Sequence, residues 1–217
     1  MVGQMNQRYP GYDVQSKREG PSWNEPTRRA IDTRVSVPDQ PRFFDSTQWL
    51  VLRAVCARIV PQPSNRPPVP LAALVDSKAF QRHGEGYRDA RLPPLPQAWR
   101  SGLAALNAEA QTLHGKAFAQ LSDHEQDALL AAMQKGQLYH PAWGAMPPKV
   151  FFSERVVHDI TAAYYSHPTA WNEIGFGGPA SPRGYVRLEA NARDAWEPAE
   201  AKPDDEGKAR ELNHRVR

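Results

Sequence analysis

The chain has 217 residues, of which 40% are hydrophobic and 24% are charged, and its formal net charge is +3 at neutral pH. A chain of this length can bury a sizeable core. Its single cysteine, Cys56, excludes an internal disulfide and a zinc site built from several cysteines. No apolar run approaches the about 18 residues of a membrane-spanning helix, so we expect no transmembrane segment.

The charge pattern argues against a dedicated nucleic-acid surface. A sequence pI near 9.1 leaves a basic nucleic-acid-binding module open as an alternative. However, positive and negative residues are interspersed rather than gathered in a basic stripe, which favours an ordinary solvated surface. The 21 prolines, against an average of about 5% of a chain, cluster between periodic segments and indicate breaks between elements.

Residues 1–42 are polar and aperiodic, yet they contain the aromatic residues Tyr9, Tyr12 and Trp23. Disordered segments are usually poor in aromatic residues. We therefore interpret residues 1–42 as an extended N-terminal arm that lays aromatic anchors on a surface. A partly disordered tail is the alternative.

Two helices are predicted in the first part of the body. The first begins at Asp45 or Ser46, either of which can cap it, and ends before Pro61. Its apolar face contains Trp49, Leu52, Cys56, Ile59 and Val60. The second covers about residues 71–82, with Pro70 suited to its start. Its inward residues are predicted to be Leu71, Leu74, Val75 and Phe80.

Two further helices have clear end signals. The third covers about residues 96–114, where an apolar stripe runs from Trp99 to Leu113 and Gly115 is a natural C-terminal glycine. The fourth covers about residues 123–135. Ser122 and Glu125 form a capping box at its start, and a glycine follows its end.

A fifth helix is predicted over about residues 148–166, between Pro148 and the stop at Pro168. Its apolar face contains Phe152, Val156, Ile160, Ala163 and Tyr164, widened by Phe151 and Tyr165. We detect no strand pattern. The expected fold is all-α: a single helical domain over residues 43–185, with about five helices and long irregular arms. Residues 186–217 form a polar C-terminal tail with Trp196 as a lone anchor, and the end from Asp204 is expected to be mobile.

The sequence contains no catalytic or metal-binding constellation that we recognise. Glu154 and His158 are four residues apart and can meet on one helix face, with Asp159 adjoining. Neither Glu-x-x-His nor His-Glu-x-x-His occurs, and the serine elbow Gly-x-Ser-x-Gly is absent. We therefore expect no catalytic, cofactor or metal site in this chain. A stand-alone enzyme that uses Glu154, His158 and Asp159 is the alternative.

The segment Trp171–Tyr185 holds four glycines, two prolines and three aromatic residues. Gly175–Ala180 formally matches a dinucleotide pattern, but that pattern needs a strand before it and a helix after it. Here a predicted helix precedes the glycines, and prolines stand where the second element would begin. Because such a segment lacks regular hydrogen bonding, its backbone must find partners on its own body or on a second molecule. We expect Trp171 and Ile174 to pin it to its own body.

Residues 161–179 read Thr-Ala-Ala-Tyr-Tyr-Ser-His-Pro-Thr-Ala-Trp-Asn-Glu-Ile-Gly-Phe-Gly-Gly-Pro. This stretch resembles the C-terminal signature of the gluconate 2-dehydrogenase subunit 3 family, which has Tyr-Tyr-Ser-x-Pro, then Trp, then Ile-Gly-(Phe/Tyr)-x-Gly. Gln48–Pro61 is similar to the opening helix of that family, and Tyr9–Arg34 is similar to a subset of longer members. Many members carry an N-terminal twin-arginine signal. Here Arg28-Arg29 has no apolar stretch behind it, so a cytoplasmic location and a periplasmic location through partner-dependent export both stay open.

The resemblance implies a non-catalytic small subunit that binds and stabilises a FAD-dependent GMC-type sugar or polyol dehydrogenase, and that chaperones it or helps its export. FAD is then expected in the partner and no cofactor in this chain, and some such assemblies add a c-type cytochrome. We expect no nucleic-acid partner and no direct membrane span. The expected contact residues come from the arm and the glycine-rich segment: Tyr9, Tyr12, Trp23, Trp171, Asn172, Phe176, Gly177, Gly178, Arg183 and Tyr185.

Overall fold

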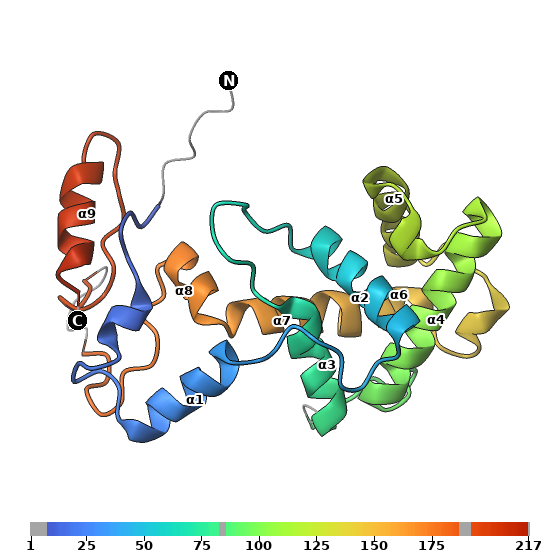
Figure 1. The fold of residues 1–217 in the computed structure, drawn as a ribbon, viewed down its shortest axis with the longest axis horizontal. Coiled ribbons are helices and arrows are strands. Elements are labelled where there is room, and N and C mark those ends of the chain that lie inside the picture. Colours follow the sequence, from blue (N-terminus) through green and yellow to red (C-terminus); the bar gives the residue numbers. More distant parts are fainter. Residues whose placement is uncertain (1–7, 83–85, 187–191, 217) are drawn as a thin grey trace. The chain divides into compact units, whose positions relative to one another are not determined.

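The computed structural model describes residues 8–82, 86–186 and 192–216. Within them it contains helices and one isolated β-bridge, between Trp23 and Ser181, and no strand, so the predicted all-α fold is confirmed (Figure 1). Two compact units are present: one is Val37–Tyr164, and the other combines Met1–Ser36 with Tyr165–Arg217. Residues 1–7 of the predicted arm, and residues 187–191 and 217 of the predicted tail, lie outside the described residues.

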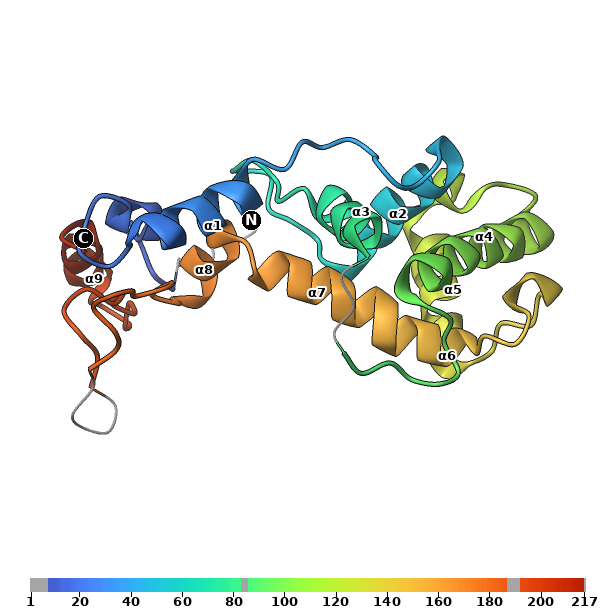
Figure 2. The same cartoon turned by 90° about the horizontal axis from the view of Figure 1, so that it is seen from below.

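The unit of Val37–Tyr164 contains the five predicted helices. They are α2 (Ser46–Ile59), α3 (Leu71–Gln81), α4 (Leu95–His114), α5 (Asp123–Lys135) and a longer helical stretch. That stretch consists of α6 (Pro148–Phe151), a π-helical segment η4 (Phe152–Val157) and α7 (His158–Tyr165). Figure 2 shows α6 and α7 as one continuous rod, with α3 and α5 beside it. Short 3-10 turns, η2 (Phe118–Gln120) and η3 (Pro141–Trp143), complete the unit.

The predicted helix ends are formed by the expected groups. The side chain of Asp45 accepts a hydrogen bond from the N–H of Gln48 at 2.8 Å. The Ser122 N–H donates to Glu125 Oε2 at 2.8 Å, and Ser122 Oγ accepts from the Glu125 N–H at 3.4 Å, which completes the capping box. Gly115 ends α4 with a φ of +66°. Local sequence signals therefore determine where these helices begin and end.

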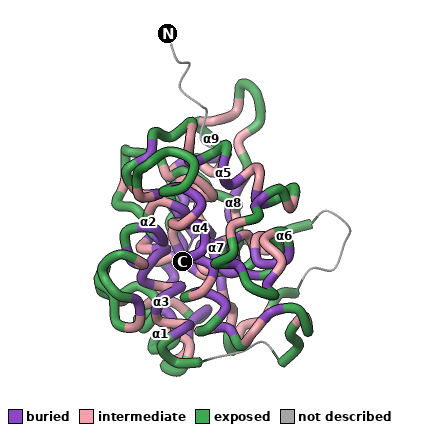
Figure 3. The backbone as a smooth tube through the Cα atoms, turned by 90° about the vertical axis from the view of Figure 1, so that its right-hand side faces the viewer, coloured by how far each residue is buried: buried purple, intermediate pink, exposed green. Residues whose placement is uncertain are grey.

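The core of this unit is centred on Trp99 and Phe151, both with no exposed surface. Their rings meet edge to face, with centroids 5.5 Å apart. Gly102 makes this contact possible, because a Cβ atom there would lie 2.2 Å from Phe151 Cζ. Cys56 is 4% exposed, as predicted, and burial raises the pKa of its thiol. Figure 3 colours the backbone by burial.

Several residues face a different side from the one predicted. Phe151 is fully buried and Phe152 is only half-buried, because η4 inserts an extra residue into the helical turn and Phe151 and Val156 then share a face. Leu113 is 60% exposed, since it lies in the last turn of α4 beyond the buried Ala110. Phe80, at the end of α3, is 48% exposed and lies under the guanidinium of Arg42.

The unit made by the two chain ends contains η1 (Val14–Lys17), α1 (Glu25–Val35), α8 (Pro168–Ile174) and α9 (Glu206–His214). The expectation of an extended arm is therefore wrong for residues 25–35, which form the helix α1. Asn24 caps α1 by accepting from the Thr27 N–H at 3.1 Å. The expectation of a mobile end from Asp204 is also wrong for residues 206–214, which form α9.

Pro168 does not begin an irregular segment. It stands in the first turn of α8, where its missing N–H has no helical partner to lose, and His167 is the cap. The irregular part of the glycine-rich segment therefore begins at Gly175. This segment belongs to the same compact unit as the arm, whereas the predicted boundaries placed it with the helical domain.

The arginines of the arm lie beside carboxylates. Arg18 pairs with Asp32, with Nη2 and Oδ2 2.8 Å apart, and Arg28 and Arg29 lie 3.5 and 3.6 Å from Glu25. These exposed pairs contribute little to stability, and they offset only part of the positive charge of this region, since Arg28 and Arg29 share one carboxylate. None of the helices formed by the described residues has the length and apolar character needed to cross a bilayer.

Candidate functional site

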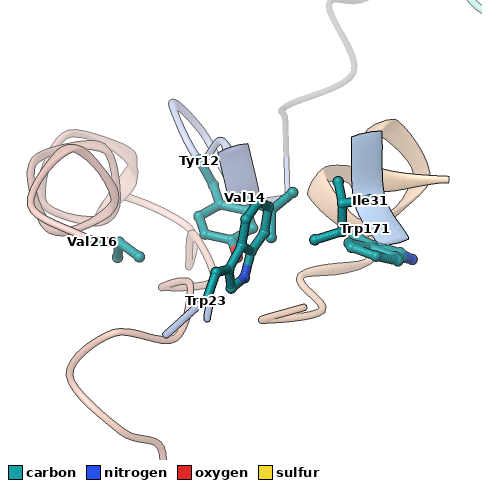
Figure 4. Packing of buried hydrophobic residues seen from close by; sticks show 6 residues of the cluster. All are labelled: Tyr12, Val14, Trp23, Ile31, Trp171 and Val216. Carbon is teal, nitrogen blue, oxygen red and sulfur yellow. The ribbon is translucent and has the colours of Figure 1, made fainter. Parts of the chain in front are cut away.

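All ten predicted contact residues lie in the unit formed by the two chain ends. Three of them, Tyr12, Trp23 and Trp171, are buried and are 2–6% exposed. They form one hydrophobic cluster with Val14, Ile31 and Val216, and the half-buried Tyr9 packs against it. In Figure 4, Tyr12, Val14 and Trp23 lie together, with Ile31 and Trp171 on one side and Val216 on the other. The arm is thus the packing partner of α8.

A side-chain amide joins the arm to α8. Asn172 Oδ1 accepts a hydrogen bond from the Val14 N–H at 2.8 Å, and Asn172 Nδ2 donates to Asp13 Oδ1 at 3.2 Å. Because Val14 has no exposed surface, water cannot replace Asn172 as the partner of this N–H without opening the unit. Asn172 therefore acts as an internal tie.

Two glycines allow the arm to approach the glycine-rich segment closely. Gly175 has a φ of +67°, and a Cβ atom there would lie 2.1 Å from Tyr9 Cζ. Gly178 has a φ of +74°, and a Cβ atom there would lie 2.8 Å from Val14 Cγ2. Both the backbone angle and the contact require glycine at these positions. The close approach that the glycines permit is made to the arm of the same chain.

A buried lysine connects the arm to the glycine-rich backbone. Lys17 has no exposed surface, and its Nζ donates to the Gly177 carbonyl at 2.7 Å and to the Tyr12 hydroxyl at 3.1 Å. The ammonium also lies 4.6 Å from the centre of the Trp196 ring. Burial lowers the pKa of Lys17 to about 8, against an opposing effect of Glu197. Lys17 is not among the predicted contact residues, because its polar neighbours in the sequence predict an exposed position.

Tyr185 and Arg183, near the end of the glycine-rich segment, contact the Gly178 carbonyl and the Trp196 ring. The Tyr185 hydroxyl donates to the Gly178 carbonyl at 2.5 Å, and its ring lies 4.6 Å from that of Trp196. The guanidinium of Arg183 lies over the same indole, 5.4 Å from its centre. The predicted anchoring role of Trp196, which is 9% exposed, is therefore confirmed within its own unit.

Three apolar side chains of this segment remain exposed. Ile174, Phe176 and Tyr185 are 45%, 42% and 39% exposed, and we call them the apolar edge. The expectation that Ile174 pins the segment to the body is wrong, because α8 turns Ala170 and Trp171 inward instead. Phe176 packs edge to face on Trp171 at 5.6 Å, so the edge stands on a fixed support. Such an arrangement suits binding to an apolar surface.

The alternative catalytic residues lie in the other unit. Asp159 has a fully buried carboxylate that accepts hydrogen bonds from Trp99 Nε1 at 2.8 Å and from Lys78 Nζ at 3.0 Å. Arg155 Nη1 lies 3.3 Å from Asp159 Oδ2. A carboxylate surrounded by donors in this way stabilises the fold through charge-assisted hydrogen bonds. It does not present an open oxygen to a substrate.

His158 and Glu154 do not complete a site with Asp159. His158 is half-exposed, with Nδ1 3.2 Å from Asp159 Oδ1, and Glu154 is exposed. In the part of the chain that the structure describes, no group of three or more His, Cys, Asp or Glu side chains is arranged to hold a metal ion. These residues therefore offer no assembled catalytic geometry.

Comparison with known families gives one match. The model of the family described as gluconate 2-dehydrogenase subunit 3 matches residues 46–178, more than half of the chain. The match begins at the start of α2 and ends within the glycine-rich segment. No curated protein and no solved structure matches the chain.

Proposed function

We propose a role as a binding subunit for this chain, which belongs to the gluconate 2-dehydrogenase subunit 3 family. The name of the family describes a subunit of a dehydrogenase complex. In our proposal the chain is the non-catalytic small subunit, and it binds and stabilises the catalytic subunit. That partner is a FAD-dependent GMC-type sugar or polyol dehydrogenase, and it holds the flavin and the substrate.

The observation that carries this proposal is the apolar edge on its fixed support. Exposed aromatic and aliphatic side chains on a rigid backbone are effective anchors at protein interfaces, because little conformational entropy is lost on binding. Phe176 is supported by Trp171, and Tyr185 by its bond to the Gly178 carbonyl. A catalytic partner that covers them would bury apolar surface now open to water.

Six of the ten predicted contact residues then divide into two roles. Tyr12, Trp23 and Trp171 are buried within their own unit and hold its shape. In our proposal, Phe176, Tyr185 and the indole-stacked Arg183 touch the partner. In a permanent complex we expect an interface above roughly 2,000 Å², so further surface of this chain takes part. A chaperone or export role and a c-type cytochrome as electron acceptor are extensions of the same proposal.

Co-purification tests this function. The tagged full-length chain is expressed with a FAD-dependent GMC-type dehydrogenase from the same genome, and the purified material is assayed for the flavin absorbance and for sugar or polyol oxidation. We expect a stable complex with FAD in the partner, and a flavoprotein that loses yield or activity without the small chain. A flavoprotein that is fully active and stable alone, together with a small chain that never co-purifies, would refute the proposal.

A further inference from the structure

A pocket in the unit of Val37–Tyr164 has a volume of about 690 Å³. Ligand pockets for small molecules fall in the range of about 300–1,000 Å³. Four arginines line it, and none of the described residues in its wall is acidic. The rest of the wall is largely apolar, and its residues include Phe43, Tyr87, Pro93, Pro94, Leu95 and Pro96.

Two of these arginines are held in place by uncharged acceptors. The guanidinium of Arg100 lies 3.9 Å from the centre of the Phe43 ring and donates to the Phe43 carbonyl at 3.0 Å. Arg88 donates from Nη1 to the Leu92 carbonyl. A carbonyl fixes the position of a guanidinium but leaves its charge in excess, because arginine stays protonated in proteins. Both groups therefore carry a positive charge that no described carboxylate of the pocket wall offsets.

A third arginine, Arg155, is buried and shares the carboxylate of Asp159 with Lys78. Its side chain is 9% exposed and lines the pocket, and its Nη1 lies 3.3 Å from Asp159 Oδ2. Lys78 binds the other oxygen of the same carboxylate at 3.0 Å. The buried Arg155 therefore has only a share of the Asp159 carboxylate. An anion in the pocket would give Arg155 a second partner, and charge pairs interact more strongly away from water.

We propose that this pocket binds a small organic anion, with its carboxylate or phosphate group held by Arg100 and Arg155 and its apolar body against Phe43 and the proline rings. A guanidinium group can donate two parallel hydrogen bonds to two oxygens of either a carboxylate or a phosphate. The π-helical segment η4 contributes to the site because Arg155 lies within it. The proposal is independent of the subunit role, since the apolar edge lies in the other unit.

Three naphthalene probes test the proposal on the full-length chain, alone or with any partner that purifies with it. They are 1-naphthoate, 1-naphthyl phosphate and the uncharged 1-naphthalenemethanol, whose fluorescence reports binding. We expect one or both anions to bind and the alcohol to bind at least about tenfold more weakly, as the loss of charge-assisted hydrogen bonds requires. The stronger anion identifies the carboxylate or the phosphate as the preferred group.

Variants locate the site. Arg100→Gln removes the charge but keeps a polar side chain, and we expect it to weaken anion binding by about tenfold. Arg155→Gln should weaken anion binding to a similar extent. Because Arg100 is exposed, Arg100→Gln should still fold and test the proposal if the buried Arg155→Gln variant does not. Arg53→Gln is the matched control, because Arg53 is 55% exposed and does not line the pocket. No anion binding, equal binding of the alcohol, or equal weakening by Arg53→Gln would overturn the proposal.

Discussion

Lys17 Nζ lies 2.7 Å from the carbonyl oxygen of Gly177, so a buried ammonium joins two segments that are 160 residues apart in the sequence. Burial lowers the pKa of Lys17 from 10.5 to about 8. Between these values the unfolded chain binds the proton and the folded chain releases it. The free energy of unfolding contributed by this group therefore rises with pH across that window.

Lys17→Met removes this titrating group. From near pH 8 to near pH 10.5, the unfolding free energy of the wild-type chain should rise relative to that of the variant, by no more than about 3 kcal/mol. Urea denaturation of both proteins at the two pH values measures this, and other titrating groups cancel in the difference. Parallel pH profiles would show that Lys17 is not desolvated in the folded protein.

Gly175→Ala tests the close approach of the arm. The alanine Cβ would lie 2.1 Å from Tyr9 Cζ, at a backbone φ of +67°. We expect the unfolding free energy to fall by about 2 kcal/mol or more, from backbone strain and displacement of the ring together. Denaturation of the purified chain measures it.

Gly184→Ala is the matched control for that change. Gly184 has a similar φ of +73°, but nothing lies within 4 Å of its added Cβ. The unfolding free energy should therefore fall by only about 1 kcal/mol, the cost of a left-handed backbone for alanine. Adding Tyr9→Ala to Gly175→Ala should then remove the part of the stability loss that comes from the clash with the Tyr9 ring. If Gly175→Ala and Gly184→Ala cost the same, Tyr9 does not lie against Gly175.

Asp159→Asn tests whether this carboxylate is structural. The change leaves the buried Arg155 and the partly exposed Lys78 without their shared negative charge, and removing one member of a buried ion pair typically costs about 3–5 kcal/mol. We expect a loss of that order in chemical denaturation. Glu154→Gln, at an exposed position of the same helix, should change stability by less than about 0.5 kcal/mol. An Asp159→Asn protein as stable as the wild type would contradict a structural role.

The helices of the body were predictable because their signals are local. The capping box of Ser122 and Glu125 and the glycine after α4 determine helix ends within a few residues of sequence. The π-helical turn at η4 was not predictable, since a sequence that reads as an ordinary helical stripe at Phe152 gives no sign of an inserted residue. The buried face therefore shifted by one position.

The architecture of the two chain ends depends on contacts between distant residues. Val14 and Asn172 are 158 residues apart, and no local pattern indicates that one binds the other. The helix α1 was missed because only Ile31 is buried in it, so it lacks an apolar stripe. Composition singled out contact residues in two distant segments, and the fold brings these segments into one unit. Composition could not distinguish the aromatics that support the segment from those that are exposed on it.

The most direct test of the central claim is the yield of the complex with the flavoprotein after substitution of the apolar edge. Phe176→Ala removes an exposed aromatic side chain while leaving Trp171 and the buried cluster in place. Tyr139→Ala is the control, because Tyr139 is 81% exposed in the other unit. We predict that Phe176→Ala lowers the yield of complex at least about tenfold, as expected for an interface anchor, and that Tyr139→Ala does not. A Phe176→Ala complex formed as well as the wild type would contradict the claim that the apolar edge binds the catalytic subunit.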